Sequence, residues 1–536
     1  MIDTQIEHQG GWRLVMQNQL DWSNSIHQPV DVSFIRNYPH TALAKAFLLA
    51  KWGQTQNARN YLDKFKSIWE TQKHPITIAM DLALVDAHTC VYEDKELQEA
   101  ELVALLDVLQ SQASSDLIGQ ALVANHLSTF ALHAGEIDKS QKYAQRAIQL
   151  YRQGSAEYGS LHMYAHLGQI HMLRGDLNGA AKQYLCMEES ANSTGTASEC
   201  YLQAIGRALR AEVAYEMNNL RGSSQLLQQS LPIVEAHDAW IDVLIAAYKV
   251  KVRLAFLEGG LPAALSQIVH ANGIAELRGM PRLQRIMQLE KIRALTLGNE
   301  LKAAESEVQK IDQYALEIFD DTNDQFDSIQ CLGIVIFLRF WIRTGRERRA
   351  LSVIEQLEGI LVVSGKLLIV AKLRVLKALA HWQLGEQKQA KSAMIQGLAL
   401  LGEQPFRRFV LDEGETAQSL VSFILQETSE TLQFSRVTRK RLQELSFNWS
   451  RGEPALGHSS SRINLPLHKT SKSQQQCCLE LLEQGFSNHE IAKTMGISIN
   501  TVKYHLKNLY RIMGVNNRAS AVRLLCSENN QEALPI

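Results

Sequence analysis

The feature that most constrains this chain is a short pattern that recurs about every 40 residues along its first three quarters. In each copy an apolar helical stretch ends at a Gly or a small polar residue, and a small residue follows. A period of this length is typical of a solenoid built from helical hairpins. The copies lie at Gly53/Ala58, Gly135/Ser140, Gly175/Ala180, Asn219/Ser224, Gly259/Ala264, Gly298/Ala303, Gly345/Ala350 and Gly385/Ala390, with Asp94 and Ala100 as a weaker copy.

Each part of the pattern has a physical reason. A Gly at the end of a helix takes the left-handed backbone conformation that lets the chain reverse, and the small residue lets the second helix lie close to the first. One hairpin cannot bury its own apolar face, so the hairpins must stack into one continuous core with a concave inner surface. The units resemble tetratricopeptide repeats (TPR), lengthened from the usual length of about 34 residues. We therefore predict an all-α fold in which residues 1–400 form a TPR-like superhelix.

Composition excludes several classes of protein. The 536 residues carry 55 Lys and Arg against 56 Asp and Glu, so the chain is not a uniformly basic nucleic-acid coat. The N-terminus has no apolar signal region, and no apolar run reaches the roughly 20 residues that a membrane helix needs. The seven Cys form no C-x-x-C pair, which indicates reduced thiols. These features predict a cytoplasmic protein that does not enter a membrane.

The repeats contain no sequence motif typical of a catalytic or metal-binding site. His162 and His166 lie four residues apart with His171 nearby, but no H-E-x-x-H arrangement is present, so we expect groove-lining or surface histidines and no metal site. The Gly365-Lys366 pair lacks the other residues of a phosphate loop. Since no catalytic motif is found, we predict that the chain is not an enzyme and needs no cofactor.

Residues 401–449 follow the repeats, and residues 450–466, with two Pro, two Gly and four Ser, are predicted to be a flexible linker. The run from Gln404 to Gly414 (QPFRRFVLDEG) resembles the segment that closes the repeat array in the large ATP-binding LuxR-type regulators known as MalT-like. A capping pair of helices with an irregular turn would fit the same residues.

The C-terminal segment carries a different charge from the rest. Residues 467–527 hold eight Lys or Arg against three Glu, a formal +5, which leaves −6 on the remainder of the chain. A small basic module of this kind is where a polyanion such as double-stranded DNA would dock.

The pattern of residues 467–530 predicts four short helices. Ser487 and Glu490 form a capping box that opens the second helix, and Gly496 ends it before a three-residue turn. Two short helices joined in this way, with cations along the outer face of the second, form a helix-turn-helix. Its predicted core consists of Ile491, Ala492, Ile497, Val502, Leu506 and Leu509.

The same segment resembles the LuxR/NarL-type DNA-binding domain nearly position by position. The matching residues include Ser487, Asn488, Glu490, Ile491, Ala492, Ile497, Ser498, Thr501, Val502, Lys503, His505, Gly514, Val515, Asn517 and Arg518. The first helix departs from the family, because Ser471–Cys478 lack its usual Arg and acidic residues. The resemblance implies base reading in the major groove by Asn500, Lys503, Tyr504 and Lys507. It implies contacts to the DNA backbone by Asn488, Lys493, Thr501, Asn508, Arg511 and Arg518.

Structural roles are an alternative for some of these residues. Thr501 could serve only to cap and pack its helix, and Asn508 and Arg518 could stabilise the fourth helix instead of contacting phosphate. Lys503 and Lys507 share one exposed stripe, and they are the strongest candidates for DNA contact.

Together these observations predict a bacterial LuxR-type, sequence-specific transcriptional regulator, most simply an activator. We expect its repeats to sense a small inducer or a protein partner, and its helix-turn-helix to bind DNA as a homodimer that contacts RNA polymerase. The MalT-like family has an ATPase domain ahead of its repeats, whereas this chain begins at the repeats. We therefore expect a member without that domain, or one served by a separate ATPase. The alternative is a helical-repeat adaptor for protein interaction with weak or no specific DNA binding.

Overall fold

The computed structural model describes most of the repeat region and a few positions of the tail. The described residues are 2–19, 31–69, 75–95, 98–111, 116–191, 197–311, 326–427, 435–450, 487, 488, 492, 502, 503 and 506. Within them the regular structure is helical, which confirms the predicted all-α class. The chain divides into two compact units, Met1–Gly457 and His458–Ile536, and the division falls inside the predicted linker.

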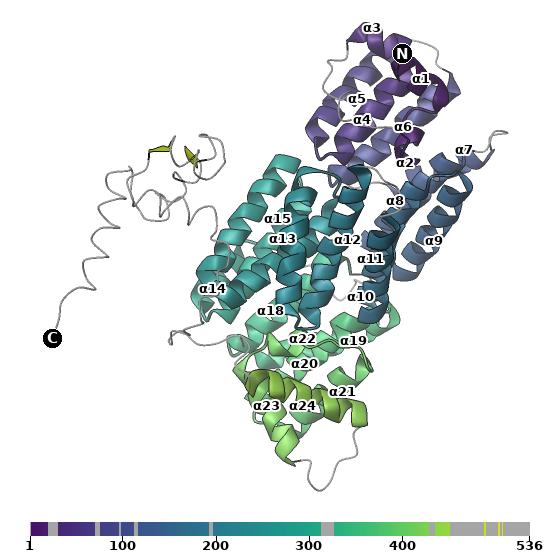
Figure 1. The fold of residues 1–536 in the computed structure, drawn as a ribbon. Helices are drawn as coiled ribbons and strands as arrows, with labels where there is room; N and C mark the ends of the chain where they lie inside the picture. Colours follow the sequence, from purple (N-terminus) through teal and green to yellow (C-terminus); the bar gives the residue numbers. More distant parts are fainter. Residues whose placement is uncertain are drawn as a thin grey trace. The chain divides into compact units, whose positions relative to one another are not determined.

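The first unit is a stack of helical hairpins that follow one another in chain order (Figure 1). The paired helices are α4 (Pro39–Lys51) and α5 (Thr55–Trp69), α6 (Ile76–Tyr92) and α7 (Glu99–Ser111), α8 (Leu117–His133) and α9 (Ile137–Gln153), α10 (Glu157–Leu173) and α11 (Leu177–Ala191), α12 (Ala197–Glu216) and α13 (Leu220–Ala236), the two halves of α14 (Ile241–Arg278), α15 (Pro281–Leu297) and α16 (Leu301–Gln309), α18 (Ser328–Arg343) and α19 (Glu347–Val363), and α20 (Leu367–Gln383) and α21 (Gln387–Leu400).

Further helices flank the hairpins at both ends. They are α1 (Ile2–Gln9), α2 (Arg13–Met16) and α3 (Val32–Asn37) before the array, and α22 (Arg408–Leu411), α23 (Glu415–Glu427) and α24 (Arg436–Ser450) after it. The N-terminal piece is anchored by Trp12, which is fully buried, and by Arg13, which pairs with Asp81 of α6 at 2.8 Å. The array is therefore covered by packed helices where it starts and where it ends.

The predicted turns adopt the conformation that the repeat pattern requires. Gly135 and Gly175 have φ of +79° and +75°. At Gly135 the next residue's N–H donates to the carbonyl of Ala131 at 2.8 Å, and the N–H of Gly135 donates to Leu132 at 3.1 Å. This is the Schellman arrangement, which satisfies carbonyls that the end of a helix leaves free. The small residues five positions after these two glycines, Ser140 and Ala180, have no exposed surface.

Four positions of the pattern need correction. The left-handed residues are Asn218 and Asn299, not Asn219 and Gly298, and the buried small residues that follow them are Ser223 and Ala304, not Ser224 and Ala303. In the third case Gly260, at φ +67°, makes the turn one residue after Gly259, although Ala264 is buried as predicted. In the fourth, Asp94 is left-handed at φ +58° but Ala100 is exposed. Asn and Asp tolerate this conformation better than other residues with a side chain. Where two candidates are adjacent, as at Asn218/Asn219, Gly259/Gly260 and Gly298/Asn299, the pattern alone does not decide which of them makes the turn.

The superhelix is wound tightly enough for hairpins far apart in the chain to touch. The Thr55 hydroxyl donates to the carbonyl of Arg278 at 3.2 Å, and Asp94 accepts from the backbone N–H of Arg282 at 2.9 Å. The side chain of Gln404 donates to Asp176 at 3.0 Å. These partners are separated by 188 to 228 residues. The array thus closes on itself around an interior, where a loosely wound solenoid would present an open groove.

Helix α14 is the one helix among the described residues that has the length and apolar composition to cross a membrane, which is weak evidence on its own. Its backbone is not helical at Gly259 and Gly260, so its two halves take the place of one hairpin in the array. The first half also buries Arg253, which pairs with a carboxylate of the neighbouring hairpin. Both features are those of a core element.

The turn at Gly135 provides a test of this winding. A Cβ added there would lie 2.3 Å from the carbonyl oxygen of Phe326 and 2.8 Å from Lys366 Nζ, whereas at Gly385, with φ +77°, it would meet nothing within 4 Å. We expect Gly385→Ala to lower the free energy of unfolding by about 1–2 kcal/mol through backbone strain alone. Gly135→Ala should cost about 1–3 kcal/mol more because of the clash.

The measurement is urea unfolding of both variants followed by circular dichroism, with the wild-type chain as reference. Equal losses for the two variants would contradict the contact between the Gly135 turn and the later hairpin.

Candidate functional site

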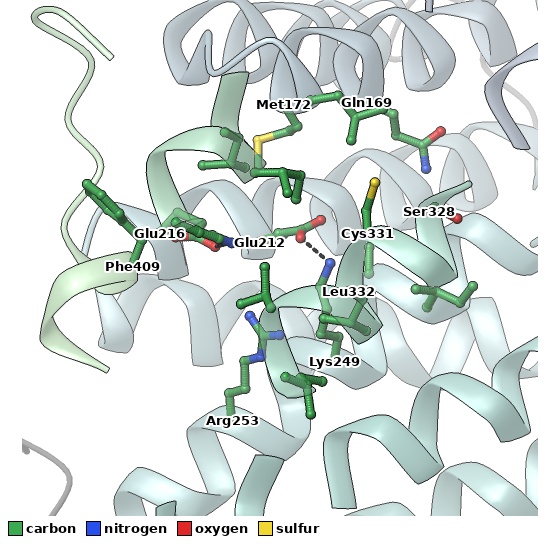
Figure 2. Close-up of a pocket in the computed structure, with 18 of the residues that line it drawn as sticks. Gln169, Met172, Glu212, Glu216, Lys249, Arg253, Ser328, Cys331, Leu332 and Phe409 are labelled. Atoms are coloured by element: carbon green, nitrogen blue, oxygen red, sulfur yellow. Dashed lines mark hydrogen bonds and ion pairs between the residues drawn. The ribbon is translucent and has the colours of Figure 1, made fainter. Parts of the chain in front are cut away.

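A cavity of about 170 Å³ lies inside the superhelix (Figure 2). Its walls come from α8, α10, α12, α14, α15, α18, α20 and α22, so helices from both ends of the winding meet around it. The wall is mostly apolar and includes Met172, Leu332, Val335, Ile369 and Phe409. A concave, mostly apolar space with a few polar groups is the usual form of a small-molecule site.

A layer of paired charges surrounds this apolar space. Arg253 of α14 donates through Nε to both oxygens of Glu290 on α15, at 3.1 and 3.2 Å. Glu290 has no exposed surface, and although burial opposes its charge, Arg253 and Arg293 hold its pKa below the usual value. Lys249 pairs with Glu212 at 2.5 Å, as Figure 2 shows. The layer binds α12, α14 and α15 to one another.

Asp412 is the carboxylate of this layer that accepts hydrogen bonds from the largest number of different side chains. It accepts hydrogen bonds from Tyr215 of α12 at 2.9 Å, from Arg293 of α15 at 2.6 Å and from Arg408 one turn earlier in its own segment. Burial works against the ionised form, but Arg408 and Arg293 outweigh it and hold the pKa of Asp412 well below its usual range. The carboxylate is therefore ionised at neutral pH, and it joins three separate parts of the unit.

The next residue makes a second link of the same kind. Glu413 accepts from Arg339 Nε with both oxygens at 3.0 Å, and the Arg343 guanidinium donates to its carbonyl at 2.9 Å. Both arginines belong to α18. Adjacent acids of the run Gln404–Gly414 thus pair with different helices, Asp412 with α12 and α15 and Glu413 with α18, which gives this run a structural role that its sequence pattern alone did not reveal.

Sequence reasoning missed the members of this charge layer. Arg253, Glu290, Arg293 and Arg339 were not among the candidate residues. The available signal was a charged side chain on an otherwise apolar helix face, such as Arg339 within the run Ile334–Ile342. A buried charge is stable only with a partner, so each such residue implies an acid elsewhere, but its position in the chain could not be read from the sequence.

Of the three repeat histidines singled out in the sequence, His162 and His166 are buried and His171 is half-buried. His162 and His166, which we expected to line a groove or to lie at the surface, line a small interior cavity of about 30 Å³ with His88, His126 and Trp240. His162 Nε2 lies 3.1 Å from Asp238, which also pairs with Lys51 at 2.7 Å. His171 pairs with Asp176 at 2.8 Å. The described residues hold no group of three His, Cys, Asp or Glu that could bind a metal ion.

Most of the predicted DNA-binding residues lie outside the described residues. In the tail, Ala492, Val502 and Leu506 are buried, Lys503 is exposed and Asn488 is half-buried, with Asn488, Ala492, Val502, Lys503 and Leu506 all helical. The roles assigned to these five residues stay predictions. The others, all outside the described residues, are Lys493, Asn500, Thr501, Tyr504, Lys507, Asn508, Arg511 and Arg518 for DNA contact, and Ile491, Ile497 and Leu509 for the core.

Comparison with protein families finds two matches along the chain. Residues 81–427 match the family described as the MalT-like TPR region, and residues 472–525 match the family of bacterial regulatory proteins described as the luxR family. The first match covers the hairpins from α6 to α23, including the whole charge layer. The second covers the predicted helix-turn-helix.

Comparison with individual proteins gives the same two regions. The chain is 20% identical over 538 residues to the HTH-type transcriptional regulator MalT of Vibrio campbellii, covering 97% of this chain and 57% of that protein. Its tail is 49% identical over 67 residues to the probable transcriptional regulatory protein SgaR of Hyphomicrobium methylovorum, covering 12% of this chain and 31% of that protein. The chain thus spans little more than half the length of the MalT relative.

A solved structure shares the fold of the repeats. The crystal structure of a Rap protein complexed with Competence and Sporulation Factor superposes with a TM-score of 0.51 at 11% identity, covering 70% of this chain and all of that one. At this identity the similarity concerns the helical-repeat fold alone.

Removing the Asp412 charge should weaken the unit strongly. Asp412→Asn leaves Arg293 and Arg408 buried beside a neutral group, and breaking a buried pair typically costs about 3–5 kcal/mol. We expect a matching fall in the free energy of unfolding at pH 7. Since the folded pKa lies below the unfolded value of about 3.9, this contribution is present above that pH and is lost as the pH falls. The gap between wild type and variant should therefore narrow below about pH 4.

Chemical denaturation of both proteins at several pH values provides the measurement. Glu403→Gln, which removes a charge at an exposed position of the same segment, serves as control and should change stability by no more than about 0.5 kcal/mol. A similar loss in both variants would contradict the central role of Asp412.

The buried histidines should make the fold sensitive to acid. Burial lowers the pKa of His126 to about 3 and that of His166 to about 4, from a usual value of 6.5. Because the unfolded chain binds these protons first, stability should decline as the pH falls below 6.5, by about 1.4 kcal/mol per pH unit for each histidine. His126→Phe should remove one such contribution and flatten the slope between pH 6.5 and 4.5, as measured by urea unfolding.

Replacement of the exposed His8 with Gln is the control for this experiment. The two variants should differ in slope, and identical slopes would show that His126 takes up its proton without unfolding.

Proposed function

The chain belongs to the family of the MalT-like TPR region, and on that premise we propose that it is a sequence-specific, DNA-binding transcriptional regulator. The observation that carries the proposal is the luxR-family match of residues 472–525, in which the helical Lys503 is exposed next to the buried Val502. A lysine in this position is suited to donate to guanine in the major groove. In this proposal the tail reads DNA as a homodimer, contacts RNA polymerase and acts as an activator.

The repeats serve as the sensor in this proposal. Their tight winding favours a small inducer over a long peptide, because the cavity inside the superhelix has a volume of only about 170 Å³. The acids that line this cavity are paired with basic groups or, for Asp242, with His133 at 2.9 Å. Such a pattern suits binding better than catalysis, so we propose no enzymatic reaction there.

The closing segment is the element that would couple the two functions. Phe409 of α22 and Asp412 directly after it form part of the cavity wall, and the chain continues from α22 through α23 and α24 to the tail. An inducer in the cavity would contact this segment directly and alter its pairing with Arg293 and Arg339. The bound state would then differ from the free state in the position or stability of the residues that lead to the DNA-binding unit.

The alternative remains a helical-repeat adaptor for protein partners whose tail binds DNA weakly. One experiment separates the two. In gel-shift assays of the full chain against genomic fragments, the regulator shows sequence preference above the salt-sensitive background. Lys503→Ala combined with Lys507→Ala should weaken the preferred complex by about tenfold or more, since each base contact is worth about 1–3 kcal/mol.

A matched control removes the same charge elsewhere. Lys388→Ala combined with Lys440→Ala takes two exposed lysines from the repeat unit and should leave the specific complex unchanged. Sequence-independent binding by the wild-type chain, or equal weakening in both double variants, would favour the adaptor.

A further inference from the structure

One cation in the wall of the cavity is incompletely paired. Lys372 of α20 makes a single ion pair among the described residues, 3.2 Å from Glu216. By contrast, Arg253 and Arg339 each donate to both oxygens of their acids. Lys249 also makes one ion pair among the described residues, but a closer one, 2.5 Å from Glu212. An ammonium group has three donors, so Lys372 retains hydrogen-bonding capacity on the cavity side.

The surroundings of Lys372 disfavour its positive charge. Burial lowers its pKa, Glu216 works in the opposite direction, and the neighbouring Arg253 and Lys249 lower the pKa further. The acid that could compensate for this excess, Asp412, already accepts from Tyr215, Arg293 and Arg408. A negative charge supplied from outside would therefore be stabilised at this point.

A second donor in the same wall has no partner. Nη1 of Arg339 is buried and makes no hydrogen bond, although the rest of its guanidinium is held by Glu413. A buried donor without a partner costs about 1–3 kcal/mol, a cost that a ligand acceptor would relieve. One acceptor, Glu216 Oε2, is likewise without a donor, which makes an amine the competing ligand chemistry.

The size and wall of the cavity define the rest of the ligand. Its volume of about 170 Å³ is slightly above that of an engineered cavity of about 150 Å³ that holds benzene. Leu332, Val335 and Ile369 line it with aliphatic groups. The body of the ligand should therefore be apolar and about the size of one ring.

We propose that this cavity binds a compact organic acid, with its carboxylate at Lys372 and Arg339 and its apolar body against the aliphatic wall. The inference rests on the proposed function in that it names the chemical class of the inducer. It extends that function, because neither the family matches nor the relatives' names point to an acid.

The test is isothermal titration of the full chain with benzoate, benzamide and benzylamine, which share a ring and differ in charge. Benzoate should bind saturably, and the other two should bind about tenfold or more weakly, because they lack the charge-assisted hydrogen bonds. Lys372→Met should reduce benzoate affinity to the level of benzamide. Lys377→Met, on the same helix but outside the cavity wall, should leave it unchanged.

A second variant keeps the test informative if Lys372→Met does not fold. Glu216→Gln removes the competing acid and should preserve or tighten benzoate binding. Weaker binding by this variant, preference for benzylamine, or absence of saturable benzoate binding would overturn the inference. The gel shift of the wild-type chain is independent of these titrations. If benzoate does not bind but the chain still binds DNA with sequence preference, only the proposed class of inducer is wrong. If the chain shows no sequence preference for DNA, the proposed function itself is wrong.

Discussion

The structure of the repeat unit depends on the contact between each early hairpin turn and a hairpin about 200 residues later in the chain. At Gly135 and Gly53 the turn is left-handed and lies so close to Phe326 and Arg278 that a side chain would not fit. This close approach sets the pitch of the winding. Because the winding is tight, the concave face that a loosely wound solenoid would present as an open groove becomes a narrow interior. The cavity and its charge layer exist only as a consequence.

The charge layer gives that interior a defined geometry at a position where an apolar core alone would pack less specifically. Asp412 and Glu413 link α22 to α12, α15 and α18, so the closing segment is held by ionic contacts as well as by apolar ones. Buried pairs of this kind add little net stability but are costly to break. A low net stability combined with a high cost of breaking suits a segment such as α22, which in the proposed function must adopt one defined arrangement with inducer and another without it. It is the physical basis for placing the coupling between inducer and DNA-binding unit at α22.

Much of the fold could be predicted from local rules. The all-α class, the hairpin period and the small residues at Ser140 and Ala180 follow from backbone conformation and helix packing, which act over a few residues. The misplacements at Asn218 and Asn299 arose where two adjacent residues could both accept a left-handed backbone, so the local pattern left the turn uncertain by one residue. The candidate site could not be predicted in this way, because Lys372, Arg339 and Asp412 pair with residues 74 to 156 positions away in the chain, and that pairing depends on the winding.

By itself, the sequence determined the helical repeat, the segregation of positive charge into the tail and the luxR-type pattern around Lys503. Each is a property of neighbouring residues or of a sum over a segment, so no knowledge of long-range contacts was needed. Only the tertiary structure decided that the solenoid closes on itself, that His162 and His166 are buried and that a ring-sized cavity lies beside Lys372. The reason is that the pitch of the superhelix is set by contacts between residues 188 to 228 positions apart. A periodic sequence pattern does not indicate which turns will be in contact.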